Sequence, residues 1–557
     1  MTRNQTTDFA AAKSPPRIPP KNRPARLHLF QKSLPAVWQP SKDSLVLMEC
    51  GREIVISGVP QPGFRVGTRM LVPHPSGSGK PLTRTHLAGI CGSGMRALAE
   101  FLNDCHVHVS GSDQSITPGD RRHFESLGIH LATADELGIP ANAPNPVGPP
   151  ELIVHSAAVP AHDPARRLAL SEGIGDLSYP EFVAWLLANR HGLCIAGTHG
   201  KSTTTALTGW LLKALGQRPG VLVGAEFRGL GRSGWDEGGV PLVVESCEYQ
   251  RHFLDYNPAS AAILSIEQDH FDCYASLTEL QATFQQFAAR IKSSGTLVIS
   301  AESLPEISWH SFTGAQVLRI GRETGHPDRT WTYDHVRLDR GGLQFRILYR
   351  GEPWATVQLP PGPEHNALHA LAAIALCSTL VDIHAPDCIS LVVEGLRSFP
   401  GLLRRFEVSD LGNNLSLIDD YAHHPTALNA TIETARKIFR GRRLVGVFQP
   451  HQASRTSALL ADFGQSLSKL DQCFLTPVYT ARETVGPQEA VRLSEQLCEA
   501  IRSLGTPCEM LFALDPIPRT LDDSLRSGDL LLTLGAGNIS RLHHAFIQRF
   551  RRDHPAG

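Results

Sequence analysis

The sequence predicts an α/β protein built from several domains with parallel sheets. A chain of 557 residues is too long for one hydrophobic core, so two to four domains are expected. From Thr85 onward, short apolar strands, Gly-rich turns and helical segments follow one another, an order typical of parallel α/β folds. Two of the Gly-rich turns stand between a strand and a helix, where parallel sheets carry ligand sites.

Composition and charge exclude several classes of protein. Hydrophobic residues make up 41% of the chain and charged residues 19%, as in an ordinary globular protein. The 53 basic and 54 acidic residues nearly cancel, so neither nucleic acid nor a membrane surface is an expected partner. The 11 cysteines are scattered, which indicates reduced thiols in a cytoplasmic protein. No apolar run reaches the roughly 18–20 residues of a membrane span, so membrane insertion is not expected.

Residues 1–84 form an N-terminal extension without a recognisable chemical motif. About the first 25 residues are polar and rich in Pro and Arg, which predicts disorder and no signal peptide. The segment VLMECGREIVIS (46–57) is a candidate hairpin. Two interpretations stay open: a regulatory extension, or a translation start assigned too far upstream.

The predicted elements of the rest of the chain follow from short apolar runs and their turn residues. The expected strands are THLAGI (85–90), HVHVSGSD (106–113), LIVHSA (152–157), GLCIAG (192–197), PLVVES (241–246), AAILSI (261–266), four runs within 296–360, NLSLIDDY (414–421), RLVGVFQP (443–450) and DLLLTLGAG (529–537). The expected helices cover 94–104, 179–191, 278–291, 366–380 and 425–439. A Pro-rich surface loop is expected at 141–150.

A Gly-rich phosphate loop joins strand GLCIAG to a predicted helix. Its backbone N–H groups and the helix N-terminus favour an anion, and Gly197 and Gly200 allow close approach. Lys201 suits the β- and γ-phosphates of ATP, and Ser202 suits Mg²⁺. Ile195 stands where the full Walker pattern has glycine, so a chance loop is the alternative. The predicted ATP-binding residues of the loop are Gly197, Thr198, His199, Gly200, Lys201, Ser202 and Thr203.

Acidic residues and a histidine follow the next two strands. Glu245 and Glu248 end PLVVES, and Asp269 and His270 follow AAILSI. Since the carboxyl ends of parallel strands share one rim, these side chains are expected beside the phosphate loop. Mg²⁺ prefers oxygen ligands, which favours Glu248, and His270 suits a second ion with mixed ligands. The alternative for EQDH is a solvated turn.

A second Gly-rich loop, Gly89–Met95, follows the first strand. It resembles a dinucleotide fingerprint, and Asp113 ends the next strand, where a carboxylate accepts a hydrogen bond from ribose. Alone, this loop suggests an NAD-dependent oxidoreductase. A second nucleotide site beside an ATP site favours a nucleotide-linked substrate instead.

Two segments near the C-terminal third carry clustered polar residues at strand-to-helix junctions. These are DDYAHHPT (419–426) and FQPHQASRT (448–456), which suit carboxylate, amine and phosphate groups. Arg404 and Arg405 precede a strand and suit a bidentate phosphate contact. The alternatives are a solvated turn and a charged surface edge.

Taken in order, these motifs resemble those of the Mur ligase family. The matching pieces are GICGSGM, GSD, AGTHGKSTTT, ESCE, EQDH, HNAL, RRF, DDYAHHPT and FQPH..SRT, spread over roughly 84–545. The resemblance implies three domains: a Rossmann-like UDP-binding domain at 85–190, a central P-loop ATPase domain with a parallel sheet at 191–396, and a C-terminal Rossmann-like domain at 397–557.

The resemblance also assigns roles by motif position. Lys201 and Ser202 would meet the γ-phosphate and Mg²⁺, and Glu248 and His270 would hold metal ions. ATP contacts outside the loop would come from Asn366, with His365 as a possible helper, and from Arg405 and Asp420. Catalytic residues beside Lys201 would be His424, His451 and Arg455. The UDP-sugar would contact Gly92, Ser93, Gly94, Met95, Asp113 and Ser156.

The activity that the resemblance implies is ATP-dependent ligation of L-alanine to UDP-N-acetylmuramate through an acyl-phosphate, a step of peptidoglycan precursor synthesis. The cofactors would be ATP and Mg²⁺. The protein would work in the cytoplasm, and it would be a monomer or a weak homodimer. Two alternatives stay open: a recycling ligase that adds a tripeptide to the same UDP-sugar, and a degenerate nucleotide-binding homologue without ligase activity.

The chain departs from the family pattern at four places. ESCE replaces EADE, His369 stands where a second asparagine is usual, Gln452 stands where arginine is common, and SYPEF (178–182) replaces an Arg-containing segment. These departures leave the strictness for L-alanine over serine or glycine open.

Overall fold

The computed structural model describes residues 71–132, 149–304, 307–411, 414–481 and 483–553, together with the backbone of five short strands between residues 36 and 70. The chain divides into two compact units, residues 1–59 and 60–557. Within the described ranges, every helix is too short or too polar to cross a membrane. The predicted disorder of about the first 25 residues and most of the Pro-rich loop at 141–150 lie outside the described residues.

The first unit contains a small antiparallel sheet in the order β1-β2-β3. Glu49 of β2 pairs with Arg52 of β3, so the hairpin predicted at 46–57 is confirmed. The strands are β1 (Ala36–Gln39), β2 (Ser44–Glu49) and β3 (Arg52–Ser57). The second unit begins with a separate antiparallel pair, β4 (Arg65–Val66) and β5 (Arg69–Met70).

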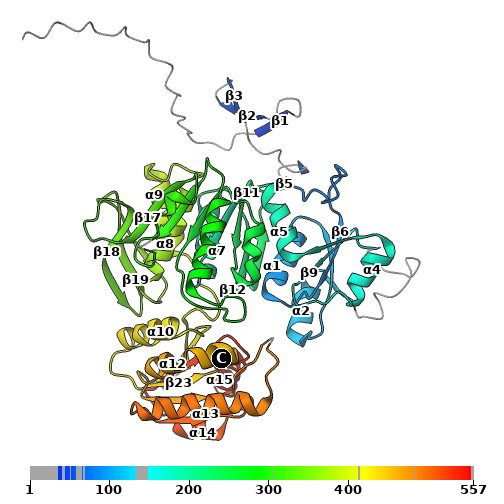
Figure 1. The fold of residues 1–557 in the computed structure, drawn as a ribbon. Coiled ribbons are helices and arrows are strands. Elements are labelled where there is room, and N and C mark those ends of the chain that lie inside the picture. The colour runs from blue at the N-terminus through cyan, green and yellow to red at the C-terminus, as the bar shows by residue number, and fades with distance from the viewer. Residues whose placement is uncertain are drawn as a thin grey trace, which may run out of the picture. The chain divides into compact units, whose positions relative to one another are not determined.

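The first large sheet is parallel throughout and has the order β10-β9-β6-β7-β8. It forms the blue and cyan part of Figure 1. Its strands are β6 (Arg84–Ala88), β7 (His108–Ser112), β8 (His130–Leu131), β9 (Leu152–His155) and β10 (Gly175–Ser178). Its helices are α1 (Ser93–Asp104), α2 (Pro118–Ser126), α4 (Pro164–Glu172) and α5 (Tyr179–Ala188).

Helix α5 starts at the SYPEF segment for a local reason. The Ser178 hydroxyl accepts a hydrogen bond from Glu181 N, and the Glu181 carboxylate accepts one from Ser178 N. This capping box satisfies two amide groups that a helix N-terminus leaves unpaired. The departure from the family pattern at this place is therefore compatible with a well-formed helix start.

The central sheet has ten strands in the order β13-β12-β14-β11-β15-β16-β17-β18-β19-β20. The strands are β11 (His191–Ala196), β12 (Gly220–Phe227), β13 (Arg232–Asp236), β14 (Pro241–Glu245), β15 (Ser260–Ile263), β16 (Thr296–Ser300), β17 (Gln316–Arg322), β18 (Arg329–Asp339), β19 (Gly342–Tyr349) and β20 (Glu352–Leu359). The middle strands are parallel, whereas β13, β19 and β20 are antiparallel to their neighbours. The β-rich segment predicted at 296–360 thus continues the central sheet.

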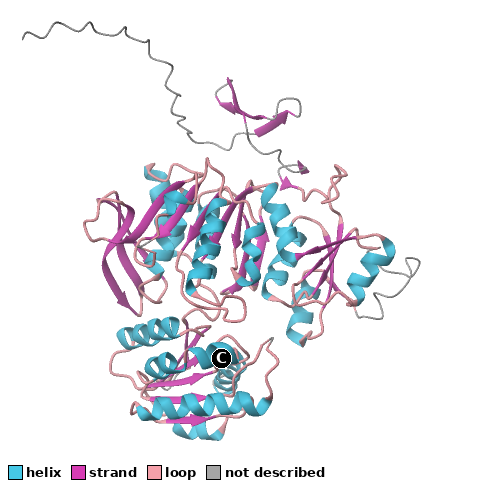
Figure 2. Ribbon diagram, viewed as in Figure 1, coloured by secondary structure: helices cyan, strands magenta, loops and turns pink. Residues whose placement is uncertain are grey.

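Both faces of the central sheet are covered by helices (Figure 2). Along β11, Leu193 and Ile195 pack into one core cluster, and Cys194 and Ala196 pack into the other. A strand that is buried on both faces has a continuous run of apolar residues, and this is why the sequence GLCIAG predicted a strand. The helical segments here are α6 (Lys201–Ala214), the 3₁₀ helix η1 (Tyr249–Asp255), α7 (Leu277–Ala289), the 3₁₀ helix η2 (Trp309–Ser311), α8 (Asn366–Cys377) and α9 (Pro386–Arg397).

The C-terminal sheet has the order β21-β22-β26-β23-β24-β25, with only β21 antiparallel. Leu531 of β26 packs on one face, and Leu530 and Leu532 pack on the other. The strands are β21 (Glu407–Asp410), β22 (Ser416–Asp420), β23 (Leu444–Phe448), β24 (Gln472–Leu475), β25 (Cys508–Met510) and β26 (Leu530–Leu534). The helices are α10 (Pro425–Ile438), α11 (Ala453–Ala458), α12 (Leu460–Leu467), α13 (Pro487–Ser503), α14 (Arg519–Ser524) and α15 (Ser540–Asp553).

Three large sheets confirm the predicted α/β class with three domains. We propose the domain bounds 85–190, 191–396 and 397–557, since each range holds one of the three large sheets, apart from Arg84 at the start of β6. Below, the three ranges are called the N-terminal, central and C-terminal domains.

Helix α1 of the N-terminal domain packs tightly on strand β13 of the central domain. The buried Glu100 carboxylate accepts hydrogen bonds from the backbone N–H groups of Ser233 and Gly234, both at 2.7 Å. A Cβ at Gly234 would overlap the backbone of α1, so glycine is required for this approach. Next to it, the buried guanidinium of Arg190 pairs with Asp236 at 2.5 Å. These buried polar contacts fasten the first two domains together.

A buried histidine in the N-terminal sheet predicts a pH-dependent stability. The two ring nitrogens of His86 lie 3.0 Å from the hydroxyls of Ser110 and Ser112. Burial, followed by the charge of His130, lowers the pKa of His86 to about 4. The neutral ring therefore contributes stability that is complete above about pH 6.5 and is lost as pH falls through the lowered pKa.

We expect His86→Gln to destabilise the protein by about 1–2 kcal/mol at pH 7.5, because at least one buried hydrogen bond is lost. The difference from the unaltered protein should shrink between pH 6.5 and 4, as measured by thermal unfolding in a pH series. The control is His162→Gln, at an exposed position. A difference that is constant across this pH range would contradict the expectation.

Candidate active site

A cavity of about 630 Å³ lies between the central and C-terminal domains. It is lined from the central domain by the phosphate loop, the segments after β14 and β15, and the start of α8. From the C-terminal domain it is lined by Arg405, the segment after β22 and the segment after β23. The cavity therefore brings together most of the motifs that the sequence singled out.

The phosphate loop runs from Gly197 to Gly200 and leads into α6. Gly197 has φ 133° and Gly200 has φ 81°, both in the region that favours glycine. The loop is held by the segment that follows β15, because Thr198 N donates to Ser265 O at 2.9 Å and His199 N donates to the Ser265 hydroxyl at 3.0 Å. The predicted strand, Gly-rich turn and helix are thus confirmed, and the N-terminus of α6 faces the cavity.

Lys201, Glu248 and His270 form one buried cluster at the start of α6. The Lys201 ammonium lies 2.9 Å from Glu248 Oε2 and 2.5 Å from Gly197 O. His270 Nε2 lies 3.7 Å from Glu248 Oε1. Burial opposes the charge on Lys201, but the Glu248 carboxylate outweighs it and raises the pKa of Lys201. The sequence was right to expect these three side chains together.

Ser202 contacts Glu245, whereas the sequence motifs placed Ser202 with Glu248 at the metal ion. Its hydroxyl donates to Glu245 Oε1 at 2.9 Å and accepts from Arg405 Nη2 at 3.0 Å. Arg405 belongs to the C-terminal domain, so this contact crosses the cavity. The predicted metal residues therefore divide into Ser202 with Glu245, and His270 with Glu248. The pairing of Ser202 with Glu245 was missed, since both glutamates end the same strand and sequence offers no means of choosing between them.

His369 fills the position where the family usually has asparagine. Its Nδ1 lies 3.1 Å from Asn366 Oδ1, and its Nε2 faces the backbone of Gly200 so closely that a Cβ there would overlap the ring. Burial, followed by the charges of His365 and Arg405, lowers the pKa of His369. The ring is therefore neutral and packs against the phosphate loop at Gly200, next to the predicted adenine contact Asn366.

Three histidines line the C-terminal side of the cavity. His424 is the N-cap of α10 and accepts from Thr426 N, and His451 lies 3.2 Å from Arg455 Nη1. Burial lowers the pKa values of His423 and His424, and it lowers that of His451 to about 4. These rings are neutral near pH 7, and a neutral imidazole can accept a proton.

A buried ion pair joins the central and C-terminal domains at the floor of the cavity. Arg455 donates from Nε and Nη2 to Asp269 Oδ1 at 2.8 and 2.6 Å. The side chains are only 2% and 5% exposed. Burial opposes ionisation of Asp269, but the Arg455 guanidinium outweighs it and holds the pKa of that carboxyl well below its usual range. Arg455 therefore positions the loop that carries His270.

Asp420 lines the cavity, but its oxygens have internal partners. They accept from Phe406 N at 3.1 Å, Ala422 N at 3.0 Å and the Thr431 hydroxyl at 3.0 Å. Burial raises the pKa of Asp420 to about 6. In this structure Asp420 shapes the turn that presents Arg405, and its predicted contact with ATP stays a prediction.

The residues predicted to bind the UDP-sugar lie at the carboxyl edge of the first sheet. Asp113 accepts from Cys91 N at 3.0 Å, which joins the two predicted segments. The Met95 side chain is 3% exposed and packs in the core, so only its backbone faces the loop. Among the described residues that line the 630 Å³ cavity, none belongs to this set. The six residues of the set are Gly92, Ser93, Gly94, Met95, Asp113 and Ser156.

Three family models match consecutive parts of the chain. They are described as "Mur ligase family, catalytic domain" at 84–191, "Mur ligase middle domain" at 195–377 and "Mur ligase, glutamate ligase domain" at 404–537. A UDP-N-acetylmuramate–L-alanine ligase of Clostridium novyi is 32% identical over 469 residues, which cover 84% of this chain and 97% of that protein. The chain belongs to the Mur ligase family.

Solved structures of Mur ligases agree with the fold. The crystal structure of UDP-N-acetylmuramate-alanine ligase from Thermotoga maritima is 26% identical, has a TM-score of 0.67, and covers 84% of this chain and 99% of that chain. A murein peptide ligase from Psychrobacter arcticus is 23% identical with a TM-score of 0.60, covers 84% of this chain and 98% of that chain, and shows a likeness of fold alone.

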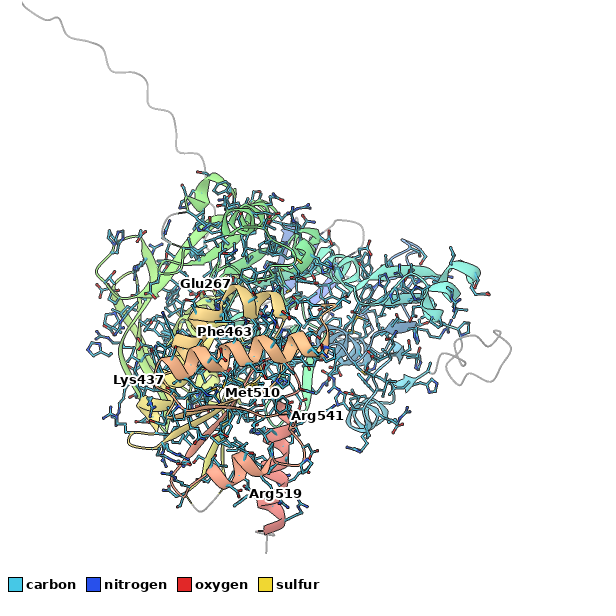
Figure 3. All side chains as sticks on the ribbon, turned by 60° about the horizontal axis from the view of Figure 1, so that its bottom comes forward. Glu267, Lys437, Phe463, Met510, Arg519 and Arg541 are labelled. Carbon is cyan, nitrogen blue, oxygen red and sulfur yellow. The ribbon has the colours of Figure 1, made fainter. Side chains whose placement is uncertain are left out.

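Sequence reasoning missed one part of this Mur ligase site. Glu267 lies between His199 of the phosphate loop and His424 of the C-terminal domain, and its carboxylate accepts from the Thr426 hydroxyl at 2.7 Å. Figure 3 labels Glu267 where the central strands approach the yellow and orange helices of the C-terminal domain. Glu267 opens the EQDH motif, so its position was visible, but its partners are 68 and 157 residues away in sequence.

Proposed function

We propose that this Mur ligase joins L-alanine to UDP-N-acetylmuramate with consumption of ATP. The observation that carries the proposal is the shared cavity: the phosphate loop lines one side, and the segments DDYAHHPT and FQPHQASRT line the other. With an ATP site on one wall of the cavity and an amine-binding site on the other, a carboxylate held between them can be phosphorylated and then attacked by the amine of an amino acid. The 32% identical relative carries the name of this activity.

The first step makes the carboxylate reactive. A carboxylate oxygen of the lactyl group attacks the γ-phosphorus of ATP, the bond to the β–γ bridging oxygen breaks, and ADP leaves with the electron pair. The product is an acyl-phosphate. Such a transfer depends on positioning and on neutralising charge, which the Lys201 ammonium and the backbone N–H groups of the phosphate loop provide.

The second step forms the amide bond. The neutral amine of L-alanine attacks the acyl carbon, and phosphate leaves as the tetrahedral intermediate collapses. The amine must lose a proton, and the neutral ring of His424, buried at the N-terminus of α10, can accept it. The buried Asp269–Arg455 pair closes the floor of the cavity, which helps to keep water from the acyl-phosphate.

The residues of the site fit Mg²⁺. Ser202, Glu245 and Glu248 offer oxygen atoms, and His270 Nδ1 is buried without a hydrogen-bond partner among the described residues. Ser202, Glu248 and His270 are the residues that would hold the metal ions. Bound Mg²⁺ would neutralise phosphate charge during transfer. Lys201 donates to the Glu248 carboxylate beside these atoms at 2.9 Å.

The cysteines bear on the compartment in which the reaction takes place. Ten described cysteines are free thiols, which fits the cytoplasm, where ATP is also supplied. We propose that the protein works there as a monomer or weak homodimer.

The test is release of phosphate from ATP and Mg²⁺ in the presence of UDP-N-acetylmuramate and one amino component at a time. We expect release with L-alanine to exceed that with glycine, L-serine or an L-alanyl-γ-D-glutamyl tripeptide by at least about tenfold. Faster release with the tripeptide would instead support a recycling ligase. An absence of release with every component would support a nucleotide-binding homologue without ligase activity. Mass spectrometry of the UDP-linked product checks which amide has formed.

A further inference from the structure

His199, Glu267 and His424 form a cluster that the ligation mechanism does not fully use. One ring nitrogen of each histidine and one carboxylate oxygen lie within 4.8 Å of one another. His199 Nε2 is 3.3 Å from Glu267 Oε2, and His424 Nδ1 is 3.6 Å from the same oxygen. An ion on His424 Nδ1 would replace the long 3.4 Å hydrogen bond that this nitrogen accepts from Thr426 N. The two rings are tilted by 52°, with centroids 5.0 Å apart.

These separations match the spacing of ligands around a small divalent ion. A tetrahedral site with bonds of about 2.0–2.1 Å places neighbouring ligand atoms about 3.3 Å apart. The two measured separations to Glu267 are close to this value. Two imidazoles and one carboxylate also form the set of three protein ligands seen in zinc sites that keep a fourth position open. All three side chains line the cavity, so that position faces solvent and substrate.

The surroundings of the cluster are suited to holding a metal ion. His199 Nε2 is buried and, among the described residues, has no hydrogen-bond partner beyond its 3.3 Å contact with Glu267 Oε2, so this nitrogen is placed to share an ion with that carboxylate. Reciprocal hydrogen bonds of 3.1 and 2.9 Å join the Thr198 hydroxyl to the backbone of Glu267. The Thr426 hydroxyl orients the Glu267 carboxylate at 2.7 Å. Outer contacts of this kind fix ligands in metal sites.

We propose that His199, Glu267 and His424 form a second metal site, specific for a transition-metal ion such as Zn²⁺, that bridges the central and C-terminal domains. The donor set distinguishes it from the Mg²⁺ site, because two imidazole nitrogens suit Zn²⁺ and Mg²⁺ prefers oxygen. His199 and Glu267 belong to the central domain, and His424 belongs to the C-terminal domain.

The bridging position gives the ion an inhibitory effect. An ion on His424 occupies the ring that the proposed mechanism needs as a proton acceptor, and it ties this ring to the phosphate loop through His199. Zn²⁺ should therefore hold the two domains together at this cluster and slow turnover. Only this inhibitory effect rests on the proposed function; formation of the site does not.

The binding test uses the full-length protein, stripped of metal and nucleotide, in buffer with millimolar Mg²⁺. Co²⁺ is the probe, because its visible absorption reports tetrahedral ligation. We expect one equivalent of Co²⁺ to bind with tetrahedral bands and to be displaced by Zn²⁺. Glu267→Gln should weaken binding at least tenfold, and His199→Asn should do the same while leaving the backbone of the loop unchanged.

Two matched variants locate the bound ion. Glu279→Gln changes a glutamate that pairs with Arg251 at the surface, and it should leave Co²⁺ binding unchanged. Glu248→Gln changes the proposed Mg²⁺ site, and it should also keep the tetrahedral bands. Zn²⁺ should raise the unfolding temperature of the unaltered protein and of Glu279→Gln, but not of Glu267→Gln. Circular dichroism without metal checks that each variant is folded.

Three results would overturn the metal site: no tetrahedral bands, equal Co²⁺ affinity in Glu267→Gln and the unaltered protein, or loss of the bands in Glu248→Gln alone. These readouts do not need ligase activity, so a failed ligation assay leaves them intact. In the ligation assay, Zn²⁺ should slow the unaltered protein by a factor at least ten times larger than the factor by which it slows Glu267→Gln. Equal factors would overturn the inhibitory effect.

Discussion

Replacement of Lys201 by alanine is expected to lower the rate of substrate-dependent phosphate release by roughly 10³-fold. Loss of one fixed group that stabilises charge in a transition state typically costs about 3–4 kcal/mol, and phosphoryl transfer relies heavily on such groups. Lys201 is suited to this task because it opens α6, lies beside the phosphate loop and keeps its charge through Glu248. Phosphate release with saturating ATP, UDP-N-acetylmuramate and L-alanine measures the effect.

The control for Lys201 is another lysine of the same helix. Lys213 lies in the last turn of α6, is about half exposed and pairs with Glu237 at 2.6 Å. Lys213→Ala should keep the rate within about twofold, since surface ion pairs contribute about 0–1 kcal/mol. Because Lys201→Ala leaves the buried Glu248 without its partner, Lys201→Arg is included to keep a positive charge there. A rate within tenfold of the unaltered protein for Lys201→Ala would contradict the role assigned to it.

Replacement of Arg455 by methionine is expected to destabilise the protein by about 3–5 kcal/mol, because it leaves the Asp269 carboxylate buried without a partner. Asp269→Asn should have a smaller effect, and the double variant should be more stable than Arg455→Met alone. We also expect kcat/KM for ligation to fall at least 100-fold. Asp269 accepts a hydrogen bond from His270 N, so loss of the contact between Arg455 and Asp269 would displace the proposed metal ligand His270. Denaturant unfolding and steady-state kinetics measure the two effects.

The matched control is a surface ion pair of the same domain. Arg436 and Asp471 lie 2.7 Å apart, and both side chains are 39% exposed. Arg436→Met should cost no more than about 1 kcal/mol and leave kcat/KM nearly unchanged. If Arg455→Met and Arg436→Met had equal effects, the domain-bridging role of Arg455 would be wrong.

Local patterns predicted the fold well because they depend on neighbours in sequence. GLCIAG is a strand buried on both faces and therefore has the sequence of an apolar run. The strand, the Gly-rich turn and the helix of the phosphate loop lie in the predicted order. The antiparallel edge strand β13 and its neighbour β12 were not recognised, because Gly-containing stretches such as GVLVGAEF and RSGWD lack a clear alternation.

The site was predicted as a set of residues but not as a set of contacts. Lys201, Glu248 and His270 were expected together, since their strands end at one rim. The choice of Glu245 as partner of Ser202, of Asp269 as partner of Arg455, and of Glu267 as the link to His424 depends on how two domains face each other. A single sequence does not encode that relation in any local pattern, so these contacts became visible only in three dimensions.

The contacts of α1 with β13 distinguish the junction of the first two domains. Glu100 and the buried Arg190–Asp236 pair join the N-terminal and central domains through buried polar contacts. The C-terminal domain follows the short segment between α9 and β21, where Gly401 O accepts from Arg228 N just after β12 and Leu403 N donates to Glu226 O of β12. Its other contacts with the central domain, such as the Arg455–Asp269 pair, line the cavity itself. Under the proposed function, exchange of the amino acid and the product would therefore require these cavity contacts to open, while the contacts between the first two domains stay in place.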